Sequence, residues 1–187
     1  MNFSLCHSCV ATFQRRKENK AEQKRKYLLS IYQAMEQDLL NDKVNFSLVF
    51  NSIVNEAIAM TSSTYGVLAY FNPDGEHYVL ALSNSAWNYS SFNFYREYRD
   101  LETFHYFVRD VGSARYYNNK SSSTVVPEGH PPIDSYAIAP IQFSFKSKLY
   151  LMVCNKKKKY NNEDIRTIDS LLRAIAATVR HYLFLVE

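Results

Sequence analysis

Apolar side chains recur at every third or fourth position in two stretches of the chain. One stripe, in residues 46–60, comprises Phe46, Val49, Phe50, Ile53, Val54, Ala57 and Ile58. The other comprises Ile165, Ile168, Leu172, Ile175, Val179 and Leu183. This spacing predicts two helices that each bury one face. The segment 161–164, Asn-Asn-Glu-Asp, is a good start for the second helix, because it offers a capping side chain and places acids at the positive end of the helix dipole.

A third helix is predicted over residues 14–41, which contain no Gly or Pro and many good helix formers. Four apolar side chains step along it by 4, 3 and 4 residues: Leu28, Tyr32, Met35 and Leu39. This heptad-like seam fits a helical dimer, and it equally fits a helix that packs on its own domain. Residues 1–13 are mixed in character and read as a loose tail.

Alternation and turn chemistry predict a first β-hairpin. Residues 65–71 are rich in aromatic and aliphatic side chains, and residues 77–83 form the partner strand. Between them, Asn72-Pro73-Asp74-Gly75 is a strong turn sequence, because proline presets φ and glycine tolerates positive φ.

A second hairpin is predicted from residues 135–145 and 149–155, joined through Lys146-Ser147-Lys148. Pro140 interrupts its first strand. Because proline cannot donate a hydrogen bond to a sheet, we expect it at an edge or a bulge.

The segments between the hairpins are less regular. Residues 84–98 are aromatic and polar, a helix is expected over 100–111, a short strand over 115–118, and a loop over 120–132. With the other elements, the order is helix, helix, hairpin, helix, hairpin, helix. It predicts an α+β fold in which helices pack on the face of an antiparallel sheet, with an N-terminal helical extension.

Charge is concentrated near the N-terminus. The net charge is +4, but the chain after residue 43 carries 14 basic and 13 acidic side chains. Residues 15–26 hold seven basic residues against Glu18 and Glu22. Such an arm can touch nucleic acid or anionic lipid, but a solvated helix face is the commoner reading, so nucleic acid is not an expected partner.

Three cysteines, Cys6, Cys9 and Cys154, make up an odd and sparse set that argues against a disulfide framework and suits a reducing compartment. The N-terminal apolar stretch precedes the positive charges, which is the reverse of a secretory signal. No run approaches the roughly 20 apolar residues of a membrane span. We therefore expect a cytoplasmic protein.

Four local motifs, in this order, resemble a GAF domain, a small sensory module, over residues 44–185. They are the helix-to-strand junction Thr61-Ser62-Ser63-Thr64-Tyr65-Gly66-Val67, the strand end Asn118-Asn119, the run from Pro127 to Ile133 followed by Pro140-Ile141, and Asn155-Lys156 followed by Tyr160 and Glu163-Asp164. The third motif is similar to a variant found in bacterial sensor kinases and cyclic-dinucleotide enzymes.

The resemblance implies a ligand pocket between one sheet face and the segments that cover it. Carried onto this chain, the wall residues are Ser83, Ser85, Trp87, Tyr89, Asn118, His130, Tyr136 and Gln142. They mix aromatic surface with hydrogen-bonding groups, as a small-molecule pocket requires. The alternative is that Trp87 and Tyr136 simply fill the core.

Several specialised activities of the family are disfavoured. The Asn-Lys-Phe-Asp-Glu signature of the cyclic-nucleotide-binding group is absent, and residues 113–135 hold no cysteine for a bilin. A redox role would rest on Cys154 alone. Haem would need His105 or His130 as axial ligand, and His130 lies in a Gly-Pro turn where a structural role is more common. The cofactor, if any, stays unknown.

Two further motifs have simple interpretations. Cys6-His7-Ser8-Cys9 has no second pair to complete a zinc site, and no metal is expected. Lys156–Lys159 can meet an acidic partner or nucleic acid, but a solvated turn that discourages edge-strand association is the simpler reading.

Residues 1–43 are therefore predicted to be a tail and basic signalling helix, and residues 44–187 a GAF domain. The expected function is non-catalytic: binding of a small ligand or protein partner, relayed through the terminal helices of a homodimer. Its interface would comprise Leu28, Tyr32, Met35, Leu39, Ile175, Val179 and Leu183. The alternative is a dimerisation or scaffolding domain without a small ligand.

Overall fold

The computed structural model describes residues 45–87, 111–119, 132–144 and 146–186. The predicted helix over residues 14–41 and its seam lie outside these ranges. So do the predicted helix over residues 100–111, apart from Val111, and nearly all of the loop over 120–132.

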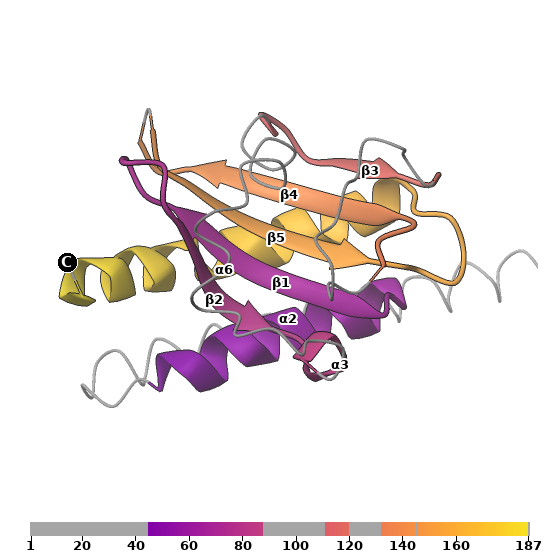
Figure 1. The fold of residues 1–187 in the computed structure, drawn as a ribbon, viewed down its shortest axis with the longest axis horizontal. Coiled ribbons are helices and arrows are strands. Elements are labelled where there is room, and N and C mark those ends of the chain that lie inside the picture. Colours follow the sequence, from indigo (N-terminus) through magenta and orange to yellow (C-terminus); the bar gives the residue numbers. More distant parts are fainter. Residues whose placement is uncertain (1–44, 88–110, 120–131, 145, 187) are drawn as a thin grey trace, which may run out of the picture. The chain divides into compact units, whose positions relative to one another are not determined.

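Five antiparallel strands form one sheet in the order β2-β1-β5-β4-β3 (Figure 1). Their bounds are β1 Tyr65–Phe71, β2 His77–Leu82, β3 Arg115–Tyr117, β4 Tyr136–Gln142 and β5 Lys148–Cys154. Both predicted hairpins are confirmed, and so is the short strand near residue 115. A register shift between Leu68 and Ala69 marks a bulge in the first hairpin, which the sequence pattern does not reveal.

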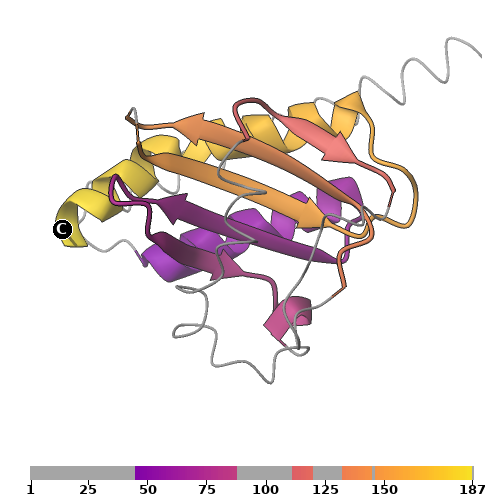
Figure 2. The same ribbon diagram turned by 45° about the horizontal axis from the view of Figure 1, so that its top comes forward.

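Two long helices lie against one face of this sheet (Figure 2). Helix α2, Phe46–Thr61, packs on β1 and β2, while α6, Asn162–Val186, packs on β4 and β5. Asn161 supports the start of α6, because its side-chain oxygen accepts hydrogen bonds from the N–H groups of Glu163 and Asp164. A short helix, α3 (Asn84–Trp87), follows β2. The α+β arrangement expected from the sequence is confirmed.

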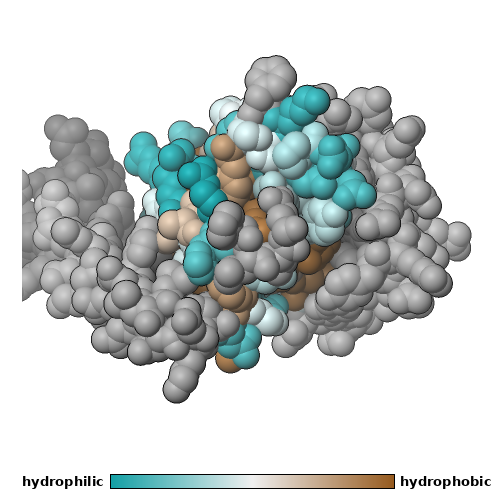
Figure 3. Space-filling model, turned by 90° about the vertical axis from the view of Figure 1, so that its left-hand side faces the viewer, coloured by the Kyte–Doolittle hydropathy of each residue, from teal (hydrophilic) through white to brown (hydrophobic). Residues whose placement is uncertain are grey.

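Strand alternation gives the sheet two apolar faces. Leu68, Leu149 and Leu151 point toward α2 and α6 and are fully buried. The opposite face, here called the distal face, carries a second buried cluster: Ala69, Phe71, Leu82, Ala86, Val111, Ile133, Tyr136, Ile138, Tyr150, Met152 and Cys154. When the left-hand side of Figure 1 faces the viewer, apolar residues are visible between hydrophilic ones (Figure 3). Both faces of the sheet are therefore core.

Pro140 lies within the interior strand β4, yet its position is locally an edge. Strand β3 pairs only with Tyr136, Ala137 and Ile138, so it ends before Pro140. Beyond that point β4 has β5 as its sheet neighbour. The missing N–H of proline therefore costs no ladder hydrogen bond, as the sequence argument requires.

Gly66 allows α2 to approach β1 closely. A Cβ at this position would lie 3.0 Å from Val54 Cγ1 and 3.1 Å from Ile58 Cδ1. Gly66→Val is expected to lower the free energy of unfolding by about 1–3 kcal/mol through overpacking. Gly112→Val is the control, because a Cβ there meets nothing within 4 Å. Urea denaturation measures both, and equal losses would contradict this packing.

Candidate functional site

The distal face has an apolar floor built by three neighbouring strands. Ile138 of β4 pairs with Met152 of β5, which pairs in turn with Val67 of β1. Ile138 is fully buried and Met152 is 2% exposed. Such a surface suits the apolar part of a small molecule, because the burial of apolar area drives binding.

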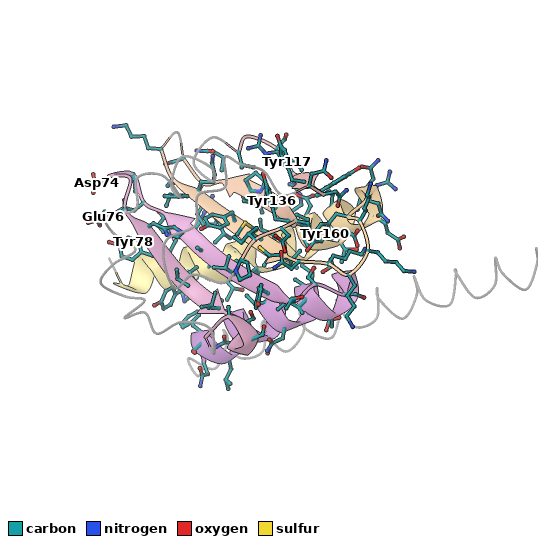
Figure 4. The ribbon with its side chains drawn as sticks, turned by 45° about the vertical axis from the view of Figure 1, so that its right-hand side comes forward. Asp74, Glu76, Tyr78, Tyr117, Tyr136 and Tyr160 are labelled. Carbon is teal, nitrogen blue, oxygen red and sulfur yellow. The ribbon has the colours of Figure 1, made fainter. Side chains whose placement is uncertain are left out.

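Hydroxyl and thiol groups lie at one end of this floor. Tyr136 pairs with Cys154 across the β4–β5 ladder, and Cys154 pairs with Tyr65 of β1. The ring of Tyr136 stacks on that of Tyr117, with 5.2 Å between centroids and 20° between planes. Figure 4 shows both tyrosines at the same end of the sheet.

An imidazole and a phenol lie at the other end. His77, at the start of β2, hydrogen-bonds through Nε2 to the hydroxyl of Tyr150 on β5. Their rings are parallel within 5°, and Phe71 packs against His77 with centroids 4.8 Å apart. Tyr150 is fully buried and His77 is 9% exposed. This pair gives the apolar floor a second polar end.

Burial keeps the Cys154 thiol and the Tyr136 hydroxyl in their neutral forms. Desolvation raises the pKa of the Cys154 thiol to about 12. Desolvation also raises the pKa of the Tyr136 hydroxyl, against the opposing effect of the nearby Arg115 guanidinium. At neutral pH Tyr136 and Cys154 are therefore uncharged hydrogen-bonding groups, and the exposed Arg115 is the charged group near them.

The buried thiol leads to a pH-dependent prediction. In a Cys6→Ser/Cys9→Ser variant, Cys154 should react with Ellman's reagent only after denaturation, because the thiolate is the nucleophile. A raised folded-state pKa contributes stability that is present below the ordinary value of 9.0 and is lost as pH rises toward about 12. Rapid labelling of the native protein at pH 8 would contradict the assignment.

Among the eight wall residues expected from the sequence, Tyr136 lies in the distal-face cluster. The side chains of Ser83 and Ser85, which follow β2, bind the backbone at the start of β1. Ser83 accepts a hydrogen bond from Gly66 N, and Ser85 donates one to Thr64 O. Gln142 is exposed at the end of β4 and donates to Ser144 O.

The side-chain amide of Asn118 forms two hydrogen bonds with the backbone of Tyr160. Its oxygen accepts from Tyr160 N at 2.6 Å and its nitrogen donates to Tyr160 O at 3.0 Å. Trp87 lies in α3, but its side chain is not among those described, and Tyr89 and His130 lie outside the described residues. The expected pocket wall therefore stays a prediction.

Three residues of the expected dimer interface are described, and they differ in how far their side chains are buried. Ile175 and Val179 are fully buried, with 0% of their surface exposed, and belong to the hydrophobic core of their own chain. Helical periodicity identifies this buried face correctly but does not say which surface covers it. Leu183 is partly exposed, whereas Leu28, Tyr32, Met35 and Leu39 lie outside the described residues.

The sequence did not point to His77 and Tyr150 as site residues. They are 73 positions apart, and both reach the distal face because β2 and β5 flank β1. The available signal was a histidine that opens a strand and a tyrosine in an apolar strand, and both are common in cores. Only the sheet order brings them together.

A hydrogen-bonded junction connects the end of β5 to the start of α6. Asn155 adopts the left-handed conformation with φ 58°, and its side chain donates to Pro132 O and accepts from Asp134 N. Tyr160 hydrogen-bonds through its hydroxyl to Ser63 at 2.7 Å, and its burial raises the pKa of that hydroxyl. The distal face and α6 are therefore joined by a short, well-anchored segment.

No group of three or more His, Cys, Asp or Glu side chains within the described ranges could hold a metal ion. None of the helices described combines the length and hydropathy of a transmembrane span.

Comparison with solved structures identifies the fold as that of GAF domains. The GAF domain of an Acinetobacter phosphoenolpyruvate-protein phosphotransferase matches with a TM-score of 0.62 at 13% identity, covering 85% of this chain and 93% of that one. The GAF domain of a protein assigned as a sensor histidine kinase from Pseudomonas syringae pv. tomato matches with a TM-score of 0.55 at 13% identity, covering 90% and 95%.

A third GAF domain, from a phosphoenolpyruvate-protein phosphotransferase of Coxiella burnetii, matches with a TM-score of 0.55 at 11% identity, covering 86% of this chain and 97% of that one. No family model matches the sequence, and no curated protein matches it. The GAF-like fold expected from the four sequence motifs is confirmed.

Proposed function

We propose that this chain is a non-catalytic sensory domain of signal transduction, which binds a small uncharged molecule on the distal face. The observation that carries the proposal is the apolar floor with hydrogen-bonding groups at both ends, His77–Tyr150 at one and Tyr136–Cys154 at the other. The GAF domains that share its fold belong to a sensor histidine kinase and to phosphotransferases, which supports a regulatory role.

The chemistry of the distal face argues for an uncharged ligand. A buried charge needs a partner charge, and Tyr136 and Cys154 are held neutral, while the Arg115 guanidinium beside Tyr136 belongs to an exposed strand. The ammonium group of Lys148 already donates to Val111 O at 2.8 Å. A molecule with an apolar ring and a hydrogen-bonding group at each end therefore fits this surface best.

The proposed relay runs from the distal face to the terminal helices. A ligand that favours one conformation of β4 and β5 would bias α6, which packs on the opposite face of both strands. In a homodimer the N-terminal seam of Leu28, Tyr32, Met35 and Leu39, with Leu183, would receive this change. Sedimentation at tens of micromolar tests this part, and a monomer would contradict it. A cytoplasmic location belongs to the same proposal.

A thermal-shift screen tests ligand binding. Uncharged ring compounds are compared with the corresponding carboxylates and phosphates, and the uncharged members are expected to raise Tm. Tyr136→Phe should weaken binding of a hit by about five- to tenfold through the lost hydroxyl. Tyr70→Phe is the control, because Tyr70 of β1 is 5% exposed, close to the 3% of Tyr136, and points to the sheet face opposite the distal face. Preference for charged compounds would contradict the proposal.

A second candidate function is supported by the burial of the distal face. Tyr136 is 3% exposed and Tyr150 fully buried, as in a face filled by its own side chains. A domain of this kind would dimerise or serve as a scaffold without a small ligand. It predicts that no compound in the screen raises Tm and that the dimer persists.

A further inference from the structure

The loop between β5 and α6 is fixed at both ends. Lys156 forms an ion pair with Asp164 at 2.6 Å, with side-chain exposures of 14% and 8%. At the other end, Tyr160 is 2% exposed, and Asn118 holds its backbone through two hydrogen bonds. The residues between Lys156 and Tyr160 therefore belong to a loop whose two ends are held in place.

Those residues are Lys157, Lys158 and Lys159, and all three are exposed. None of them forms an ion pair with any residue in the described part of the chain. Lys156 neutralises Asp164, so the exposed charge of the loop is that of three ammonium groups. Three adjacent like charges repel one another and favour an anionic partner.

Asn118 places this loop beside the edge strand β3. Lys157 is three residues from Tyr160, a backbone path of at most about 11 Å. Tyr117 directly precedes Asn118 and is 47% exposed, and Tyr116 is 36% exposed. Arg115 is also exposed on this strand. We call Arg115, Tyr116, Tyr117, Lys157, Lys158 and Lys159 the tyrosine–lysine surface.

Tyr117 is held in a fixed orientation. One face of its ring is stacked on Tyr136, and Tyr136 is itself 3% exposed and pairs within the β4–β5 ladder. A ring that is half-exposed and backed by a buried aromatic side chain is a preorganised stacking platform.

Two exposed acids lie far from the tyrosine–lysine surface. Asp74 and Glu76 of the β1–β2 turn lie at the opposite end from Tyr117, Tyr136 and Tyr160 (Figure 4). The exposed acids on the segments next to the tyrosine–lysine surface are Asp134 and Glu163, against three lysines and Arg115. The surface therefore has a net positive charge.

We propose that the tyrosine–lysine surface binds single-stranded nucleic acid, with phosphates on the lysines and Arg115 and a base on Tyr117. Positive groups beside an exposed aromatic ring are the elements by which proteins bind single strands without sequence preference. An acidic peptide added as a strand to β3 is less favoured, because three residues of edge offer few backbone hydrogen bonds and leave the Tyr117 ring unused. This proposal does not rest on the distal-face ligand, although Tyr117 stacks on Tyr136 of the distal face.

Fluorescence anisotropy of the full chain with a labelled twelve-nucleotide oligo(dT) tests the proposal. Engagement of three or four phosphates predicts a slope of log K against log salt of about −2 to −3. The triple variant Lys157→Ala/Lys158→Ala/Lys159→Ala should reduce that slope by about 2. Tyr117→Ala should weaken binding at least about fivefold while leaving the slope unchanged.

Lys146→Ala is the matched control, because Lys146 is an exposed lysine in the turn at the opposite end of β4 and β5. It should bind like the wild type, and circular dichroism checks that each variant is folded. Absence of binding at low salt overturns the proposal. So does a triple variant with wild-type affinity, which would assign binding to the basic arm at residues 15–26. Equal binding of a deca-glutamate peptide, with no effect of Tyr117→Ala, would indicate a general anion surface and also overturn it.

Discussion

Tyr150→Ala is expected to lower the free energy of unfolding by about 3–5 kcal/mol, as for other large aromatic truncations in cores. Tyr150 is fully buried between β1 and β4, where its ring packs beside Phe71 and His77. Truncation removes this ring, opens a cavity and deletes the hydrogen bond to His77. Urea denaturation should show a lower midpoint with an unchanged m-value.

Two comparisons separate the causes. Tyr150→Phe keeps the ring and removes only the hydroxyl, and should cost about 1–2 kcal/mol. Tyr78→Ala should cost less than about 1 kcal/mol, because Tyr78 is 41% exposed on the edge strand β2. If Tyr150→Ala and Tyr78→Ala lost the same stability, the assigned burial of the distal face would be wrong.

Asp164→Ala is expected to lower the free energy of unfolding by about 2–3 kcal/mol, because it leaves the part-buried ammonium group of Lys156 without its counter-charge. Both carboxylate oxygens of Asp164 bind Lys156 Nζ, at 2.6 and 2.7 Å, and one also accepts from Asn161 N at 2.9 Å. The substitution therefore also loosens the start of α6. Thermal and urea unfolding measure the loss.

The control for this pair is Asp169→Ala. Asp169 pairs with Arg173 one turn along α6, and Arg173 is 67% exposed, so the loss should be at most about 0.5 kcal/mol. The double variant Lys156→Met/Asp164→Leu removes both charges and should be more stable than Asp164→Ala alone. If the double variant is as unstable as Asp164→Ala, the unpaired charge of Lys156 is not the cause of the lost stability.

Local patterns in the sequence were sufficient to predict the five strands and the two long helices that the structure describes, but not the short helix α3. The turn Asn72–Gly75 and the alternation around it specify the first hairpin, and the apolar stripes specify α2 and α6. These signals are local because each depends on a few neighbouring residues. The bulge at Leu68 and Ala69 has no such signal, since it depends on how β1 fits β2 and β5 together.

The candidate site was harder to predict, because its contacts are distant in sequence. The family resemblance predicts Tyr136 as a wall residue, and the structure places it in the distal-face cluster, whereas His77 and Tyr150 meet only through the strand order. Ser83, Ser85 and Asn118 form hydrogen bonds with backbone groups, a role that the sequence pattern does not reveal. Ile175 and Val179 show that a buried helix face can belong to the protomer's own core.

Native mass spectrometry of the freshly purified full chain, followed by denaturing mass analysis, tests the sensory proposal most directly. The predicted result is a native mass that exceeds the sum of the subunits by one small molecule per protomer, with the excess lost on denaturation. The same spectrum counts the subunits, and a dimer is predicted. Native mass equal to the bare chain, with no uncharged compound raising Tm in the screen, would contradict ligand binding on the distal face.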